Sequence, residues 1–155
     1  MSGQHGKRLD LLLLVEDEPD HARLIMKTLK EKVKLMNPIH WVKNGAEAIA
    51  YITQTGTYDE ESAPRPSLVL LDIKLPLKDG FEVLKVIKSN EKYRAIPVIM
   101  LTTTSRTDDV QKALDLGAND YIVKPVRFPD FVEKVGALSH YWIFVSDSNR
   151  VRPEW

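Results

Sequence analysis

Cysteine is absent from this chain of 155 residues, so the sequence offers no disulfide, no thiolate nucleophile and no cysteine ligand for a metal. A chain without disulfides suits a reducing compartment, and we expect a cytoplasmic protein. Long apolar runs are also lacking. The first run, 11–15, has five residues before acidic residues interrupt it, too few for a signal-peptide core or a membrane span. The sequence therefore predicts neither export nor a membrane partner.

The chain has no excess of either charge, because 22 Lys and Arg residues balance 22 Asp and Glu residues. No overall field then draws the protein to nucleic acid or to an anionic membrane, so any electrostatic function must be local. Histidine is scarce too, and none of the four has metal-ligand spacing to another. We expect His21 and His40 to be solvated or to face a partner.

Five short runs rich in Leu, Ile and Val recur along the chain, each followed by residues with helical spacing. Near-continuous apolarity within a run is typical of a parallel strand covered on both faces. Apolar residues three or four apart are typical of one-faced helices. The pattern predicts one α/β domain over 1–155, with five strands and five helices. The predicted strands are Leu11–Val15, Ile39–Val42, Leu68–Leu71, Val98–Leu101 and Tyr121–Val123.

Polar side chains stand where these runs end. Glu16 and Asp17 come directly after the first predicted strand, and Asp72 comes directly after the third. Thr102 ends the fourth, and Lys124 directly follows the fifth. The carboxyl ends of parallel strands share one edge, where ligands bind at the topological switch point. We therefore expect three carboxylates, a hydroxyl and a lysine to converge there.

Three converging carboxylates need a counterion, because like charges a few ångströms apart disfavour each other's ionised form. Oxygen ligands without His or Cys favour Mg²⁺, or Mn²⁺ as a substitute. The Lys124 ammonium and the Thr102 hydroxyl then remain for the outer oxygens of a phosphoryl group. A carboxylate in such a place is an acceptor for phosphoryl transfer, and we assign that role to Asp72.

Each residue has a plainer explanation when taken alone. Asp72 could serve the turn that follows it, and Lys124 could be a solvated lysine. Glu18 and Asp20, at the start of the first predicted helix, favour capping and dipole roles. The convergence of several strand ends favours the functional reading for Asp72 and Lys124.

The chain resembles the receiver domain of two-component response regulators. The matching motifs are "LLVEDEPD", "LLDIKLPLKDG", "PVIMLTTTS" and "DYIVKP", within a stretch that covers roughly residues 9–138. Within that family the chain is most similar to the small stand-alone regulators paired with bacterial phytochromes, through "GTYDEESAPRPSLVLLD" and "FVEKVGALSHYW". The resemblance implies a flavodoxin-like, doubly wound sheet of five parallel strands in the order 2-1-3-4-5.

The resemblance also implies a function: Asp72 accepts a phosphoryl group from a phosphohistidine on a partner histidine kinase. Mg²⁺ would be held by Asp17, Asp72, the backbone carbonyl of Lys74 and, through water, Glu16. The family often has Asp where this chain has Glu16, which keeps the charge and adds a methylene. Lys124 would bind the phosphate.

In such receivers Thr102 moves toward the new phosphate and Tyr121 turns inward, a population shift between two packings. Lys124 is often joined to Pro125 by a cis peptide bond. Lys74 and Thr104, each two residues beyond a site residue, flank the path of attacking water. We expect Lys74 to cover the phosphoryl group in part.

The ends of the chain carry separate expectations. Residues 1–8 form a short extension, and 139–155 form an extended aromatic helix and tail. The segment "YWIFV" is apolar on every side, which indicates a further partner for the helix. Tyr141, Trp142 and Phe144 are the expected anchors of a homodimer or of a docked kinase. No DNA-reading segment is recognised, so we expect no nucleic-acid partner.

Three other functions compete with a phosphorylated receiver. A constitutive receiver-like module could bind or dimerise without phosphorylation, although that reading needs a missing site residue. An Mg²⁺-dependent phosphatase of the aspartyl-nucleophile type would be an enzyme, but such enzymes commonly have a second Asp where this chain has Lys74. A dimeric DNA-binding protein is disfavoured by the zero net charge. We expect a phosphoacceptor rather than an enzyme.

Overall fold

The computed structural model describes residues 11–32, 35, 37–103, 107–136, 143–144 and 150–151. Its main sheet has the strands β1 (Leu12–Val15), β2 (Ile39–Val42), β3 (Leu68–Asp72), β4 (Val98–Thr102) and β5 (Asp120–Val123). The α-helices are α1 (Pro19–Lys27), α2 (Gly45–Thr53), α3 (Gly80–Ser89), α4 (Thr107–Asp115) and α5 (Phe128–Gly136). A π-helical turn, η2 (Thr28–Lys32), extends α1.

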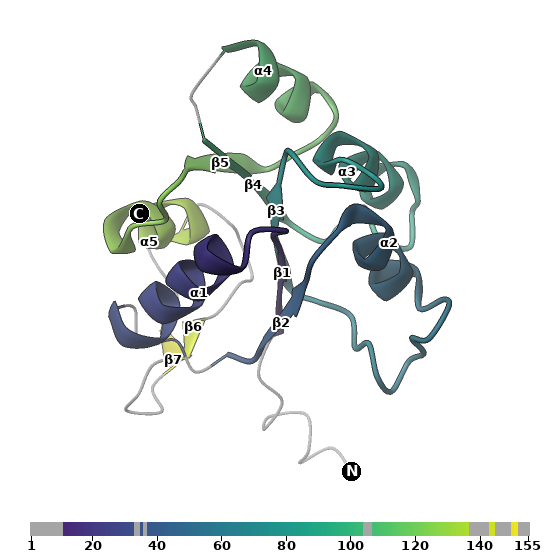
Figure 1. Ribbon diagram of the computed structural model, residues 1–155, viewed down its shortest axis with the longest axis horizontal. Coiled ribbons are helices and arrows are strands. Elements are labelled where there is room, and N and C mark those ends of the chain that lie inside the picture. The colour runs from purple at the N-terminus through teal and green to yellow at the C-terminus, as the bar shows by residue number, and fades with distance from the viewer. Residues whose placement is uncertain are drawn as a thin grey trace.

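All neighbouring strands of the main sheet are parallel, and their order is β2-β1-β3-β4-β5. Helices α1 and α5 cover one face of this sheet, and α2 and α3 cover the other (Figure 1). The predicted flavodoxin-like fold is confirmed: it has five helices and five parallel strands, and the strands lie in the order 2-1-3-4-5. Within the described ranges, no helix is both long and apolar enough to cross a membrane.

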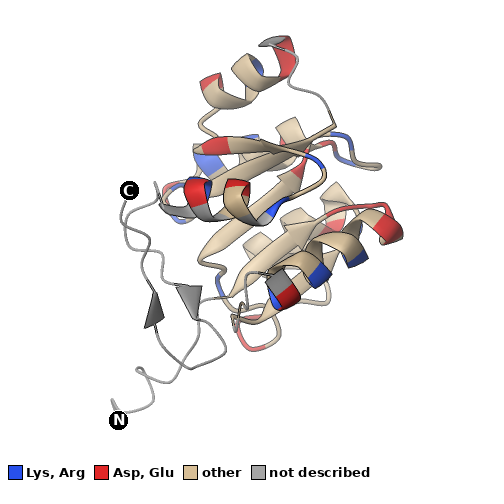
Figure 2. Ribbon diagram, turned by 90° about the vertical axis from the view of Figure 1, so that its left-hand side faces the viewer, with Lys and Arg blue, Asp and Glu red and all other residues tan. Residues whose placement is uncertain are grey.

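The strands bury both of their faces, so alternate residues enter two separate cores. On one side, Leu13, Val15 and Leu71 pack with residues of α2, α3 and α4. On the other side, Leu12 and Leu14 pack with residues of α1 and α5. In Figure 2 the strands of the sheet are almost entirely tan, and most charged residues lie on helices and loops. Burial of each such side chain contributes about 1.5–3 kcal/mol, which holds the strand ends firmly in place.

The helices that follow β2 and β3 begin at capped ends near the carboxyl edge of the sheet. Asn44 caps α2, where its side-chain oxygen accepts a hydrogen bond from the Glu47 N–H at 2.7 Å. Asp79 and Glu82 form a reciprocal capping box at the start of α3. The ends of these helices, and hence the loops before them, are therefore fixed beside the strand ends.

The C-terminal segment differs from the predicted helical extension. Within the described residues helix α5 runs to Gly136, and Ile143–Phe144 form a short strand, β6, that pairs antiparallel with β7 (Arg150–Val151). A helical continuation through 143–144 is therefore wrong. Aromatic and β-branched residues favour strands, and a short all-apolar run cannot distinguish a buried helix from a strand. Tyr141, Trp142 and the side chain of Phe144 lie outside the described residues.

The polar insert between α2 and β3 is a surface loop, and aromatic rings attach it to the domain. The Tyr51 and Tyr58 rings lie with their centroids 5.2 Å apart, and His40 lies 4.7 Å from Tyr51. The Tyr51 hydroxyl donates to the Pro64 carbonyl at 2.9 Å, and the Gln54 amide donates to the Ala63 carbonyl at 2.9 Å. These contacts attach the loop to α2 at Tyr58, Ala63 and Pro64.

Tyr51 gives the fold an expected weakness at alkaline pH. Burial, with the charge of Tyr58 as a lesser cause, raises the pKa of Tyr51 to about 12. An unfolded tyrosine ionises near pH 10, so above about pH 10 the unfolded state loses a proton that the folded state keeps. We expect the free energy of unfolding to fall between about pH 10 and pH 12, by at most roughly 1.4 kcal/mol per pH unit from this group.

Denaturant unfolding of Tyr51→Phe at a series of pH values tests this expectation. The variant loses the titrating hydroxyl, so its stability should fall less over that range than the wild type's. Tyr93→Phe, at a half-buried tyrosine outside the Tyr51–Tyr58 pair, is the matched control and should keep the wild-type slope. An alkaline loss of the same size in Tyr51→Phe would contradict the assignment.

Candidate functional site

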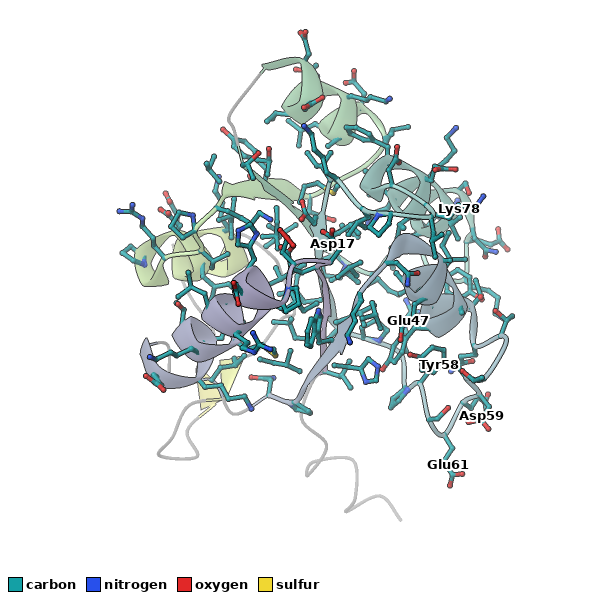
Figure 3. The ribbon with its side chains drawn as sticks, in the orientation of Figure 1. Asp17, Glu47, Tyr58, Asp59, Glu61 and Lys78 are labelled. Carbon is teal, nitrogen blue, oxygen red and sulfur yellow. The ribbon has the colours of Figure 1, made fainter. Side chains whose placement is uncertain are left out.

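Three carboxylates meet at the carboxyl edge of the sheet. Asp72 is the last residue of β3 rather than the first residue after it, and Glu16 directly follows β1. Because Val15 pairs with Leu71, the next step along both strands brings Glu16 beside Asp72. Glu16, Asp17 and Asp72 each offer an oxygen within 4.8 Å of the others. Figure 3 shows Asp17 close to the end of β1, over the middle of the sheet.

The Lys124 ammonium lies between two of these carboxylates. Its Nζ donates to Glu16 Oε1 at 2.8 Å and to Asp72 Oδ2 at 2.9 Å. The Lys124 side chain is only 8% exposed, and Glu16 and Asp72 are also buried. Burial opposes the charge of Lys124, but its hydrogen bonds to Glu16 and Asp72 outweigh this and raise the pKa of the ammonium. A buried cation thus balances the carboxylates.

Glu16 is the most enclosed of the three acids. Burial raises the pKa of its carboxyl, the hydrogen bond from Lys124 lowers it, and the charge of Asp72 raises it again. Glu16 Oε2 also accepts the backbone N–H of Glu18 at 3.1 Å, and the Glu16 carbonyl accepts the Trp41 indole N–H at 2.8 Å. Glu18 stands at the N-cap of α1, but its side chain makes no capping hydrogen bond, contrary to expectation.

A cleft of about 290 Å³ opens over this cluster. Its walls include the predicted site residues Asp17, Asp72, Lys74, Thr102 and Lys124. The structure therefore brings together side chains from the ends of four strands, as the sequence predicts. A cleft of this size, lined by carboxylates, a lysine and a threonine, has room and charge for a phosphoryl group beside a small cation.

Two predicted residues contribute to the cleft in different ways. Thr102 ends β4 and is buried. The backbone N–H of Lys74 donates to Asp72 Oδ1 at 3.3 Å, while its side chain is exposed at the rim. Both residues line the cleft together with Asp72. Thr104, the second residue expected beside the path of water, lies outside the described residues.

Tyr121 lies on β5 and is not among the residues that line the cleft. It is half-buried, it packs against the core of α2, α3 and α4, and the Lys134 ammonium lies 4.9 Å from the centre of its ring. Lys134 also binds Asp120 at 3.0 Å and so ties α5 to β5. The peptide bond from Lys124 to Pro125 is cis, in agreement with the resemblance.

Several residues that line the cleft were not predicted from sequence, among them His21 and Asp109. His21 is half-exposed, as expected, but its Nδ1 lies 3.2 Å from Lys124 Nζ and 3.8 Å from Glu16 Oε2. Asp109 of α4 also lines the cleft. The position of His21 in the first turn after β1 is the only hint of its place, and Asp109 has no local signal because α4 reaches the cleft through tertiary packing.

A family model for the response regulator receiver domain matches residues 12–136. Among curated proteins, the response regulator Rcp1 of Synechocystis sp. is 38% identical over 133 residues, which are 86% of this chain and 88% of Rcp1. A structure of the Mn²⁺-bound form of Rcp1 superposes with a TM-score of 0.68 at 40% identity, over 78% of this chain and 85% of that one.

Two further solved structures are similar. The bacteriophytochrome response regulator AtBRR has a TM-score of 0.81 at 38% identity, over 90% of this chain and 99% of AtBRR. The phosphorylated cyanobacterial phytochrome response regulator RcpA has a TM-score of 0.69 at 39% identity, over 79% of this chain and 85% of RcpA. These matches agree with the buried acidic cluster and its lysine, and the chain belongs to the response regulator receiver domain family.

Proposed function

We propose that this chain is a phosphoacceptor in two-component signalling, in which Asp72 takes a phosphoryl group from a phosphohistidine of a histidine kinase. The observation that carries the proposal is the Lys124 ammonium, buried between Asp72 and Glu16 beneath an open cleft. A buried lysine that is hydrogen-bonded to two acids can move one of these hydrogen bonds to an incoming phosphate. The other acid stays paired with it, so the ammonium always has an anionic partner. Membership of the receiver family supports the same function.

The donor set suits Mg²⁺ or Mn²⁺. Carboxylate oxygens of Glu16, Asp17 and Asp72 gather within 4.8 Å, and no His or Cys is among them. The backbone carbonyl of Lys74 completes the proposed set, with Glu16 acting through water. When bound, the cation would neutralise the charge that develops on the transferring phosphoryl oxygens. The similar protein Rcp1 has been solved in an Mn²⁺-bound form, which supports the choice of ion.

The residues of the chain then divide the work of transfer. A carboxylate oxygen of Asp72 bonds to phosphorus as the phosphorus–nitrogen bond breaks, and the kinase imidazole leaves with the electron pair. Lys124 moves its hydrogen bond from Asp72 to a phosphoryl oxygen. Thr102, at the end of β4, offers its hydroxyl to another. Movement of Thr102 opens space toward Tyr121, and the resulting shift between two packings is the signal.

The partners belong to the same proposal. Receiver domains act with histidine kinases, and the likeness to AtBRR, a bacteriophytochrome response regulator, favours a phytochrome as the kinase. Self-association or kinase docking through Tyr141, Trp142 and Phe144 stays a prediction, and so does a cytoplasmic setting. Action through protein contacts agrees with the general role of receivers as signalling modules rather than enzymes.

Two alternative functions, an aspartyl phosphatase and a module that binds without phosphorylation, fit the site less well. An aspartyl phosphatase commonly has its general acid two positions beyond the nucleophile, and there this chain has Lys74, which cannot serve as a carboxylic acid. A module that binds without phosphorylation would need none of the charge pairing seen at Lys124. We therefore favour a phosphoacceptor over both.

Phosphorylation from a small donor tests the acceptor. Incubated with acetyl phosphate and Mg²⁺, the protein should gain the mass of one phosphoryl group, seen by intact mass spectrometry, and Asp72→Asn should gain none. Asp115→Asn, at an exposed acid at the end of α4, should be modified like the wild type. Modification that persists in Asp72→Asn would show that another residue is the acceptor.

Removal of the lysine tests the charge balance. In EDTA, Lys124→Ala leaves Glu16 and Asp72 unpaired, and we expect a loss of about 3–5 kcal/mol in the free energy of unfolding. Because the ammonium no longer competes for the carboxylates, Mg²⁺ should raise the melting temperature of this variant more than that of the wild type. Lys134→Ala, which breaks a more exposed pair, should lose about 1 kcal/mol or less and show the wild-type response to Mg²⁺. An equal response to Mg²⁺ in Lys124→Ala would argue against a cation at these oxygens.

The lifetime of the phosphorylated state tests the lid assigned to Lys74. Its exposed side chain lines the cleft, so Lys74→Ala should admit water more readily. An effect of about 1 kcal/mol on the barrier is roughly fivefold in the rate of dephosphorylation, followed by intact mass after removal of the donor. Lys78→Ala removes a lysine of the same loop that is not among the cleft-lining residues and should leave the rate unchanged. An unchanged lifetime in Lys74→Ala refutes the lid.

A further inference from the structure

The loop between β3 and α3, residues 73–79, passes against the N-terminal turn of α2. The Gly45 N–H donates to the Pro76 carbonyl at 3.3 Å. A Cβ built on Gly45 would overlap the carbonyl oxygen of Lys78 and would lie 2.5 Å from the carbonyl carbon. Both contacts involve backbone, which cannot swing aside as a long side chain can. Only glycine therefore permits this approach of helix and loop.

The other end of the loop is equally close to the backbone of β3. The Gly80 N–H donates to the Ile73 carbonyl at 2.7 Å, and a Cβ on Gly80 would overlap the Asp72 carbonyl oxygen. Between these points the Lys78 N–H also donates to the Pro76 carbonyl, at 2.8 Å. Leu77 has a φ of 70°, in the left-handed region that side chains rarely adopt. A loop with such a residue needs outside contacts to hold its shape.

Helix α2 is a firm support for that contact. The Glu47 carboxylate accepts the Tyr58 hydroxyl at 3.0 Å through Oε2 and the Lys43 N–H at 3.2 Å through Oε1. Glu47 and Tyr58 lie next to each other in Figure 3, where the polar insert meets α2. Ala48 and Ile52 are buried in the core beneath. The N-terminal turn of α2 is thus held by side-chain hydrogen bonds and by the core, so an atom added to Gly45 would act on the loop that it faces.

From this geometry we propose that Gly45 is a positioning residue, which through the 73–79 loop sets the place of the Lys74 carbonyl as a ligand for the divalent cation. The inference rests on the proposed function, because the cation is part of it. Mg²⁺ requires near-octahedral ligands at about 2.0–2.1 Å and tolerates little displacement. Relief of the overlap that a Cβ creates would require the loop and the helix end to move apart, and with the loop its carbonyl groups. Lys74 lies only two residues from the Pro76 contact.

The test is a Mg²⁺ titration followed by the fluorescence of Trp41, whose indole binds the Glu16 carbonyl. Trp142 and Trp155 are replaced by Phe in every protein of the series, so that Trp41 alone reports. Gly45→Ala should bind Mg²⁺ at least about tenfold more weakly than its parent. An affinity equal to that of the parent would overturn the inference.

The matched control is Asn44→Ala. It removes the N-cap of the same helix turn and lowers the melting temperature, but it adds no atom beside the loop. Its Mg²⁺ affinity should stay within about twofold of the parent. If Asn44→Ala weakens Mg²⁺ binding as much as Gly45→Ala does, general loosening of α2 explains the effect and the positioning role is wrong.

The wild-type chain offers a second measurement in case Gly45→Ala fails to fold. Coupling between two sites is reciprocal, so Mg²⁺ must tighten the helix–loop contact if that contact aids Mg²⁺ binding. Mg²⁺ should slow hydrogen exchange of the Gly45 N–H several-fold more than that of the Thr55 N–H, which bonds the Ala50 carbonyl at the far end of α2. Equal slowing of the two amides would overturn the inference.

These outcomes stay distinct from failure of the proposed function. If the wild type neither binds Mg²⁺ nor accepts a phosphoryl group, the proposed function itself is wrong. If the wild type does both and Gly45→Ala binds Mg²⁺ equally well, only the role of Gly45 is wrong.

Discussion

The whole site depends on one buried cation between two buried acids. Lys124 Nζ lies 2.8 Å from Glu16 and 2.9 Å from Asp72, and removal of either charge type would leave the other uncompensated at the edge of the core. These residues come from three strand ends distant in the chain, so the pairing requires the register of the complete sheet. Sheet, core and charge balance are therefore formed together. The two-sided burial of β1 and β3 serves this end, because it leaves their last residues little freedom.

Around this fixed centre, other parts of the proposed site lie on a loop rather than on the strands. The strand ends hold Asp72 and Thr102, whereas Lys74 and Leu77 stand on the loop that follows β3. Gly45 and Gly80 allow that loop to approach α2 and the end of β3 closely. Contacts of this kind cost little when the residue has no Cβ, and they allow a loop with a left-handed leucine to keep one shape. A ligand supplied by a backbone carbonyl needs such support, since no side-chain rotamer can correct its position.

The fold and the central site could be predicted from sequence because their signals are local. An apolar run that ends in Asp72 predicts a carboxylate at the end of a strand. If the strands are parallel, their ends share one edge, which predicts that Asp72 meets Glu16 and Lys124. His21, Asp109 and Gly45 could not be placed in this way. Their roles depend on where α1, α4 and α2 pack against the edge of the sheet, which no short pattern specifies. The strand at Ile143–Phe144 was missed for another reason: a short all-apolar run suits a buried helix and a strand equally.

The longer side chain of Glu16 adds a last constraint. Its two oxygens accept hydrogen bonds from different partners, from Lys124 at Oε1 and from the Glu18 N–H at Oε2. A cation that takes Glu16 Oε1 or Asp72 Oδ2 as a direct ligand would therefore weaken the hydrogen bond that Lys124 donates to that oxygen. Under the proposed function, a cation at these oxygens would therefore share the carboxylates with the ammonium. Lys124 stays, by the same geometry, beside the Asp72 carboxylate that would carry the phosphoryl group.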